Sequence, residues 1–227
     1  MEKIHTFIDM LNCKMPFSLA RFNDGEMNAI KKPECIVARG DQRSSKKLSE
    51  HLSMALRHEQ HNYWKGVPCS LCWGELHKLS MTMVDGEYPF LTNAVVTTNR
   101  NWNIFKDGFC NAVLNNVSNV IWISGGDQKL DKLGFPVSIH ITMPTVNSYS
   151  MFDKVNAQID ILQPGDIVVL SCGPLSRIIA YEWWKKRQDC TILDVGSAFD
   201  PFTRNVWHNC HIWENGKNKV KPCKECN

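Results

Sequence analysis

The stretch of sequence that decides the fold runs from residue 164 to residue 196 and reads PGDIVVLSCGPLSRIIAYEWWKKRQDCTILDVG. Its run at 167–170 is continuously apolar, as in a parallel strand that helices cover on both faces. A turn of small residues at 171–174 leads into a helix expected over about 175–186. Another apolar strand, at 191–195, completes a strand–helix–strand unit, which predicts a parallel sheet with right-handed crossovers.

The same alternation of strands and helices fills the chain up to about residue 200. Further strands are expected at 17–22, 94–98, 120–124 and 137–141, and further helices at 44–61, 102–115 and 150–162. We therefore predict one α/β domain over residues 1–200, built on a Rossmann-like, mostly parallel sheet flanked by helices. Residues 201–227 are polar and carry three cysteines, so we expect them to form an extended, Cys-rich C-terminal arm.

The composition is that of an ordinary globular protein. Of the 227 residues, 43% are hydrophobic and 22% are charged, which argues against long disordered stretches. A net charge of +3 argues against a broad basic surface for nucleic acid. No run approaches the roughly 20 apolar residues of a membrane helix, and Asp9, Asn12 and Lys14 interrupt the N-terminal apolar stretch. We expect a cytoplasmic protein without a membrane span, whose ten cysteines are thiols or metal ligands.

The first candidate site follows the strand at 17–22. Asp24 and Glu26 are separated by one residue, so both carboxylates can reach a hard cation such as Mg²⁺ or Mn²⁺ if the backbone turns at Gly25. Arg21 adds a fixed positive charge for a phosphate. The alternative is a plain turn with solvated acids, because a lone D-x-E triplet often occurs by chance.

Other candidate positions follow the remaining strands, because ligands of parallel sheets bind beyond the carboxyl ends of their strands. The turn at 171–176 opens a helix whose N-terminus suits an anion, although it also fits a turn without a ligand. Glycines after the strand at 120–124 allow a close backbone approach, or simply a tight turn. Near the last strand, the carboxylates of Asp194 and Asp200 are candidates for a general base, or for binding a hydroxyl of the sugar or the acceptor. The residues concerned are Gly125, Gly126, Gly173, Pro174, Ser176, Asp194 and Asp200.

Two C-x-x-C pairs indicate a possible structural zinc site. Cys69 and Cys72 form one pair and Cys223 and Cys226 the other, which would supply the four thiolates of a tetrahedral site and clip the arm to the loop at 69–72. Their separation is far greater than in a zinc ribbon. Rival ligands lie in the same arm, namely His208, Cys210 and His211.

Taken in order, three of these segments resemble a known family. The sequence FSLARFNDGE at 17–26 resembles the RFGDGE signature of the GT-D-type glycosyltransferases, first described as a domain of unknown function. Residues 168–200 resemble the family's G-P turn, its helix and its closing D-(I/V)-G strand. Residues 143–153 resemble its P-x-x-N-A-(F/Y) segment. The resemblance implies a Rossmann-like fold, a UDP-sugar donor and a divalent metal, Mn²⁺ or Mg²⁺, held through D-x-E.

The resemblance also implies roles for single residues. Asp24 and Glu26 would bind the metal and the diphosphate, and Arg21 would support the phosphates. The donor pocket would be lined by Gly173, Pro174 and Ser176, with Asn147 and Asp194 nearby. The sequence departs from the family at Asn23, where glycine is usual, and at Ser197, where histidine is frequent. Ser197 removes a possible base, which leaves the acceptor side of the site the less defined half.

These observations predict a metal-dependent glycosyltransferase, a hexosyl- or pentosyltransferase that inverts the anomeric centre. Asp24 would act with the metal, and Asp194 or Asp200 would deprotonate the acceptor hydroxyl. The acceptor would be a glycan, a protein or a modified DNA base. The alternative is a zinc-stabilised nucleotide- or nucleic-acid-binding module without catalysis. The sequence predicts no oligomeric state.

Overall fold

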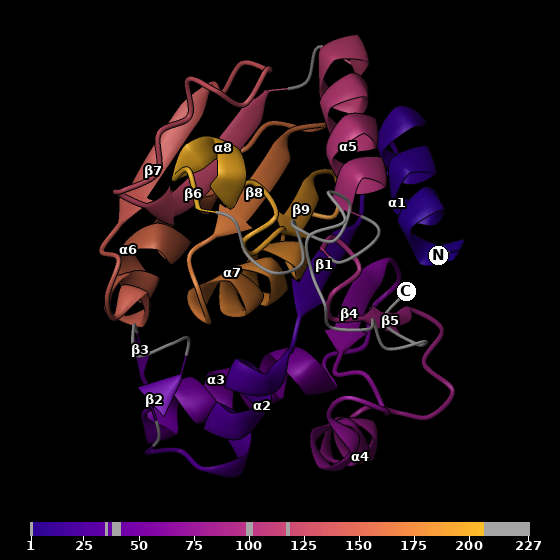
Figure 1. The fold of residues 1–227 in the computed structure, drawn as a ribbon, viewed down its shortest axis with the longest axis vertical. Coiled ribbons are helices and arrows are strands. Elements are labelled where there is room, and N and C mark those ends of the chain that lie inside the picture. The colour runs from indigo at the N-terminus through magenta and orange to yellow at the C-terminus, as the bar shows by residue number, and fades with distance from the viewer. Residues whose placement is uncertain (1, 35, 38–41, 99–101, 117–118, 207–227) are drawn as a thin grey trace.

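A seven-stranded sheet forms the centre of the computed structural model, which describes residues 2–34, 36–37, 42–98, 102–116 and 119–206 (Figure 1). In sheet order the strands are β5 (Leu91–Asn93), β4 (Tyr63–Val67), β1 (Ser18–Arg21), β9 (Thr191–Asp194), β8 (Ile167–Ser171), β6 (Val120–Gly125) and β7 (Ile139–Met143). All neighbouring pairs in this sheet are parallel. The predicted α/β architecture is therefore confirmed, and the sheet is parallel throughout rather than mostly so.

The strand order places a crevice beside β1. From β1 the chain continues outward through β4 to β5, and it later returns through β8 to β9, which pairs with β1 on its other side. The connection that follows β1 leads away from β9, and the chain reaches β9 from the opposite half of the sheet, so the strand order reverses at the boundary between these two strands, which is a topological switch point. Open parallel sheets bind their ligands at such a point, outside the carboxyl ends of the strands.

Helices cover both faces of the sheet (Figure 1). One hydrophobic cluster joins one face to α1 and α5, which run side by side, and the other cluster joins the opposite face to the helices α2, α3, α4, α6 and α7. The helices are α1 (Glu2–Asn12), α2 (Asp24–Lys31), α3 (Lys46–Arg57), α4 (Gly74–Met83), α5 (Trp102–Asn116), α6 (Phe152–Asn156), α7 (Leu175–Trp184) and α8 (Asp200–Thr203). A small antiparallel pair, β2 (Ile36–Val37) and β3 (Gln42–Arg43), stands apart from the sheet.

The apolar run in β8 is continuous because both of its faces are covered. Ile167 and Val169 belong to the cluster with α1 and α5, whereas Val168 and Leu170 belong to the cluster with α7. Alternate side chains of a strand point to opposite faces, so each face receives two of these residues. This burial explains why the run contains no polar residue.

The expected strand at 94–98 is wrong. The strand β5 ends at Asn93, and the chain then turns because the Asn93 Oδ1 atom accepts a hydrogen bond from the Val95 amide (3.1 Å) and the Asn93 carbonyl accepts one from Val96 (3.0 Å). Asparagine readily replaces a strand ladder with such local bonds. The expected β-branched run therefore forms the turn that follows the strand.

Two other elements differ from expectation. The helix expected at 150–162 is divided into the 3₁₀ turn η3 (Ser148–Met151), the helix α6 and the 3₁₀ turn η4 (Ala157–Ile161), although Val155, Ile159 and Leu162 are buried as its spacing predicts. The strand expected at 137–141 lies two residues later, because Ile139 pairs with Ile121 at the start of the β6–β7 ladder.

The strand β4 was not predicted, because Lys65 and Gly66 interrupt its apolar run. Lys65 is fully buried, and its Nζ atom lies 3.9 Å from the centroid of the Tyr88 ring. Burial lowers the pKa of Lys65 to about 8. The helices α1, α2 and α4 were not predicted either. Among the described residues, no helix is both long and apolar enough to cross a membrane.

Candidate active site

A cavity of about 440 Å³ lies along the carboxyl ends of the strands, at the boundary identified from the strand order. Its lining comes from the segments that follow β1, β5, β6, β7, β8 and β9. A volume of several hundred Å³ is typical of small-molecule sites. The cavity therefore brings together segments that are far apart in the sequence.

Asp24 and Glu26 lie in the first turn of α2, and both line the cavity. The Glu26 Oε2 atom accepts a hydrogen bond from the backbone amide of Asn23 (3.0 Å), as in a capping box, and the Glu26 side chain is buried. Within the described part of the chain, the Asp24 carboxylate makes no hydrogen bond or ion pair. Glu26 is thus held by the protein, whereas Asp24 can accept a ligand.

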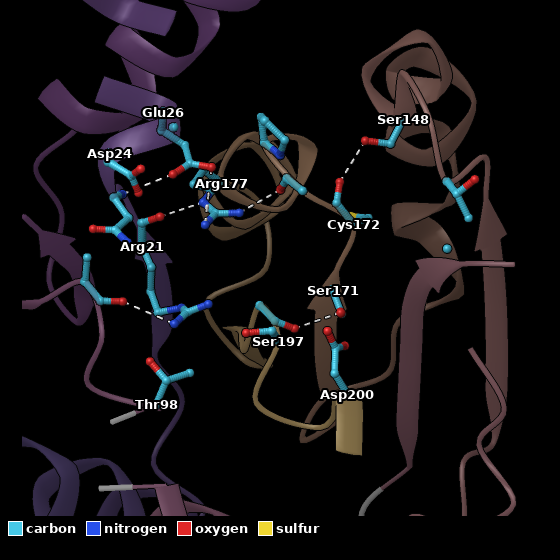
Figure 2. Close-up of a pocket in the computed structure, with 18 of the residues that line it drawn as sticks. Arg21, Asp24, Glu26, Thr98, Ser148, Ser171, Cys172, Arg177, Ser197 and Asp200 are labelled. Carbon is cyan, nitrogen blue, oxygen red and sulfur yellow. Dashed lines mark hydrogen bonds and ion pairs between the residues drawn. The ribbon is translucent and has the colours of Figure 1, made fainter. Parts of the chain in front are cut away.

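Arg177, which was not predicted, joins the first turns of α2 and α7 (Figure 2). Its Nη2 atom lies 3.4 Å from Glu26 Oε1, and its Nη1 atom donates a hydrogen bond to the Gly173 carbonyl (2.7 Å). Its Nε atom lies 3.1 Å from Asp194 Oδ2 and donates to the Arg21 carbonyl. Burial alone would lower the pKa of Arg177, but Asp194 and Glu26 more than offset this and raise it. The guanidinium therefore stays charged and fixes both turns.

Asp194 lies beneath the cavity and does not line it. Its side chain has no exposed surface, and it accepts hydrogen bonds from the backbone amides of Arg21 (3.1 Å) and Gly196 (3.1 Å). The Arg21 Nη2 atom lies 3.7 Å from Asp194 Oδ1. This geometry favours a positioning role for Asp194 over the catalytic role expected from the sequence. Asp200, the other candidate base, does line the cavity.

The turn between β8 and α7 forms one wall of the cavity, through Gly173 and Pro174. Gly173 has a φ of 63°, which favours glycine. Ser176 is fully buried, and its Oγ atom accepts a hydrogen bond from the Cys172 amide (3.0 Å), so it supports the turn and does not line the cavity. Burial raises the pKa of the Cys172 thiol to about 12, so Cys172 is protonated and is a poor nucleophile.

Gly125 lines the cavity, but Gly126 and Asn147 do not. Gly126 donates its amide to the Met143 carbonyl (2.9 Å). Asn147 has a left-handed backbone (φ 55°) and accepts a hydrogen bond from the Arg43 amide at its Oδ1 atom (3.0 Å). Gly126 and Asn147, which were expected to contact the nucleotide-sugar donor, therefore lie outside the lining of the cavity and make contacts within the protein.

Arg204 also lines the cavity and was not predicted. Its Nη2 atom donates a hydrogen bond to Asp127 Oδ1 (3.0 Å), and its Nε atom lies 2.9 Å from Asp127 Oδ2. Its Nη1 atom lies 3.6 Å from Asp200 Oδ2. In Figure 2, Asp200 lies on the opposite side of the pocket from Asp24. The cavity thus has two charged groups of residues, one around Arg177 and one around Arg204.

A chain of buried hydrogen bonds supports the floor between these groups. The Trp122 indole donates to Gln128 Oε1 (3.0 Å), and Gln128 Nε2 donates to Ser171 Oγ (2.8 Å). Ser171 in turn donates to the Gly196 carbonyl (2.8 Å). The next residue, Ser197, lines the cavity. The turns after β8 and β9 are therefore fixed from below.

The structure describes only half of the expected zinc site. Cys69 is buried and Cys72 is exposed, in the loop that connects β4 to α4. Cys223 and Cys226 lie outside the described residues, as do the rival ligands at 208, 210 and 211 and most of the C-terminal arm.

Solved structures show which fold this is. A selenomethionine-substituted structure of domain of unknown function 1792 superposes with a TM-score of 0.70 at 12% identity, covering 98% of this chain and 84% of that one. The chain has the fold of this domain. A second structure of the domain, described as having a distinct glycosyltransferase fold, gives a TM-score of 0.68 at 13% identity over 98% and 84% of the two chains.

A third structure, a glycosyltransferase of domain 1792 from Streptococcus sanguinis, gives a TM-score of 0.70 at 14% identity. The superposition covers 96% of this chain and 86% of that one. No family model matches the sequence, and no curated protein matches it. The similarity therefore establishes the fold, whereas the function of such a fold depends on the residues of its site.

Proposed function

We propose that this protein is a glycosyltransferase that moves a sugar from a nucleotide-sugar donor, a UDP-sugar, to a hydroxyl group. One observation carries the proposal. The Asp24 carboxylate and the N-terminal turn of α7 line the same cavity, at the switch point of a fold whose solved examples include glycosyltransferases. A helix N-terminus favours the negative charge of a diphosphate, and a carboxylate favours a cation bound to it.

The charges around the cavity support a divalent cation. Three guanidinium groups, of Arg21, Arg177 and Arg204, face the three lining carboxylates of Asp24, Glu26 and Asp200. Asp194 and Asp127 pair with these arginines from outside the lining, so these eight described side chains together carry a formal charge of −2. A diphosphate would be repelled by this charge unless a cation entered with it.

The residues present fit Mg²⁺ or Mn²⁺ bound together with the donor. Such ions commonly use one or two protein carboxylates and take other oxygens from phosphates and water. Asp24 fits this role, whereas Glu26 would first have to leave Arg177, so we assign Glu26 to support. Among the described residues, no three His, Cys, Asp or Glu side chains are grouped to hold a metal by themselves. When bound, the cation would neutralise the diphosphate leaving group.

The other residues divide the transfer between two sides of the cavity. The amides at the start of α7 would bind the diphosphate, which leaves with the electrons of the bond between the sugar and the phosphate. Asp200 lies on the opposite side and would take the proton of the acceptor hydroxyl as its oxygen bonds to the anomeric carbon. Attack opposite the leaving group inverts the anomeric centre. The acceptor is a hydroxyl of a glycan, a protein or a modified DNA base.

A screen of nucleotide-sugars tests the proposal. We expect a UDP-sugar to raise the melting temperature in the presence of Mn²⁺ or Mg²⁺, and to be slowly hydrolysed to UDP. EDTA should abolish both effects. A protein that neither binds nor hydrolyses any nucleotide-sugar would contradict the proposal and would favour a binding module without catalysis.

The expected zinc site can be tested separately through the zinc content and the stability of the protein. If the pairs Cys69/Cys72 and Cys223/Cys226 clip the arm to the α4 loop, the purified protein should contain one zinc ion per chain by mass spectrometry. Replacing Cys223 and Cys226 with serine should remove it and lower the melting temperature. Replacing Cys13, which is exposed and lies outside both pairs, should leave the zinc content unchanged. Zinc-free protein with normal stability would disprove the clip.

A further inference from the structure

Arg204 and Asp127 form a charged pair at the side of the cavity away from Asp24. Two contacts join the pair, a hydrogen bond from Arg204 Nη2 to Asp127 Oδ1 (3.0 Å) and an ion-pair contact of 2.9 Å between Nε and Oδ2. Two such contacts restrict the orientation of the guanidinium group. The side chains are 28% and 48% exposed, so the pair is open to a ligand and is not part of the core.

The pair keeps hydrogen-bonding capacity, and Arg204 brings it to the lining of the cavity. A guanidinium group has five N–H donors. The Arg204 Nη1 atom lies 3.6 Å from Asp200 Oδ2 and makes no hydrogen bond to any residue that the structure describes. Its two N–H groups therefore remain available. The Asp127 carboxylate also retains lone pairs, because each of its oxygens has one neighbour in the pair.

The absence of a side chain at Gly125 leaves room for the Asp127–Arg204 pair. A Cβ atom on Gly125 would lie 2.6 Å from Asp127 Oδ1 and 3.0 Å from Arg204 Nη2, so a side chain here would displace the pair. Because Gly125 lines the cavity at the end of β6, its missing side chain lets the pair lie over the end of the strand. From the sequence alone, Gly125 allows either a close approach to a ligand or a tight turn. The structure shows that it first makes room for this ion pair.

The charge of this group selects the kind of ligand. Arg204 stands between two carboxylates, those of Asp127 and Asp200, so the three side chains carry a formal charge of −1. A phosphate or carboxylate would be disfavoured here. Hydroxyl groups fit, because they are neutral and can donate to the carboxylates while accepting from the guanidinium.

We propose that the Asp127–Arg204 pair binds hydroxyl groups of the donor's sugar and contributes to the choice of sugar. This inference rests on the proposed function, in which the sugar lies between the diphosphate near α7 and the base Asp200. A sugar in that position comes within reach of Arg204, the neighbour of Asp200. The pair is a binding and specificity group, and it takes no part in bond breaking.

Calorimetric titrations with UDP and with UDP-glucose, UDP-galactose and UDP-N-acetylglucosamine, all in Mn²⁺, test the inference. For the best-bound sugar, Asp127→Asn and Arg204→Lys should reduce the ratio of the UDP to the UDP-sugar dissociation constant by about tenfold. Gly125→Ala should act in the same direction while keeping all charges. UDP itself should bind Arg204→Lys and Gly125→Ala, which keep the charge, as it binds the wild type.

Asp189→Asn is the matched control. Asp189 forms a bidentate pair with Arg187 and is 45% exposed, close to the 48% of Asp127, but its partner Arg187 does not line the cavity, whereas Arg204 does. For Asp189→Asn, the ratio of the UDP to the UDP-sugar dissociation constant should equal that of the wild type. Variants of the Asp127–Arg204 pair that change UDP and UDP-sugar binding equally, or alter only the acceptor KM, would overturn the inference. A wild-type protein that binds none of these ligands would instead overturn the proposed function.

Discussion

Replacing Arg177 with alanine is expected to lower the free energy of unfolding by about 3–5 kcal/mol and to abolish donor binding. The side chain contacts two buried carboxylates, those of Glu26 and Asp194, and two carbonyl groups in the turns it joins. Its removal leaves both carboxylates without their shared partner in a buried environment, which costs more than the pair itself contributes. Urea-induced unfolding measures the change in stability, and a thermal shift with UDP and Mn²⁺ measures binding.

Two further variants separate a specific role from general damage. Arg177→Lys keeps the charge, but one ammonium group cannot reach all four partners, so an intermediate loss is expected. Lys31→Ala removes an exposed ion pair with Glu75 and should change the stability by less than about 0.5 kcal/mol. If Arg177→Ala were as stable as Lys31→Ala and still bound UDP, the network around Arg177 would not organise the site.

The fold could be predicted because its central signals are local. The run in β8 is apolar on both faces, and such a run followed by a turn and a helix has few other interpretations. The strand β4 was not predicted because a lysine usually indicates an exposed position, whereas Lys65 is buried against the Tyr88 ring. The helix α2 had a readable signal, since Asn23 and Glu26 stand three residues apart as in a capping box, but these residues were interpreted as a turn.

The site could be predicted only where it follows a strand. Asp24, Gly173 and Asp200 line one cavity because parallel strands end at the same edge, which the sequence pattern already implied. Arg177 contacts the carbonyl of a residue 156 positions away, and no spacing rule connects such residues. One signal was present. A cation in the first turn of a helix opposes the helix dipole, so Arg177 should have indicated a compensating acid nearby.

The burial of Asp194 changes what the D-(I/V)-G segment is for. Its place at the end of a strand suggested catalytic groups. Asp194 instead accepts hydrogen bonds from the Arg21 and Gly196 amides and forms ion pairs with the guanidinium groups of Arg21 and Arg177. Gly196 has a φ of 52°, and a Cβ there would overlap the Arg21 guanidinium. The geometry therefore favours a role for this segment in shaping the pocket, and we expect the residues that line the pocket to contact the ligand.

Asp24→Asn is expected to lower the rate of sugar transfer or donor hydrolysis by about 10²- to 10³-fold. The amide keeps the size of the side chain but loses the charge that would hold the cation against the diphosphate. Because Asp24 makes no hydrogen bond or ion pair with the described residues, this change should leave the free energy of unfolding nearly unaltered. A loss of activity without a loss of stability is what distinguishes a ligand from a structural residue.

Glu75→Gln is the matched control, since Glu75 lies in the first turn of α4 as Asp24 lies in that of α2, and Glu75 is exposed. It should retain full activity. Raising the Mn²⁺ concentration should partly restore Asp24→Asn, because a weakened site fills at higher metal. Glu26→Gln should instead lose stability as well as activity, since its carboxylate serves the Asn23 amide and Arg177. Full activity in Asp24→Asn would show that the cation, if required, is held elsewhere, and that the positive ends of α2 and α7 bind the diphosphate without this carboxylate.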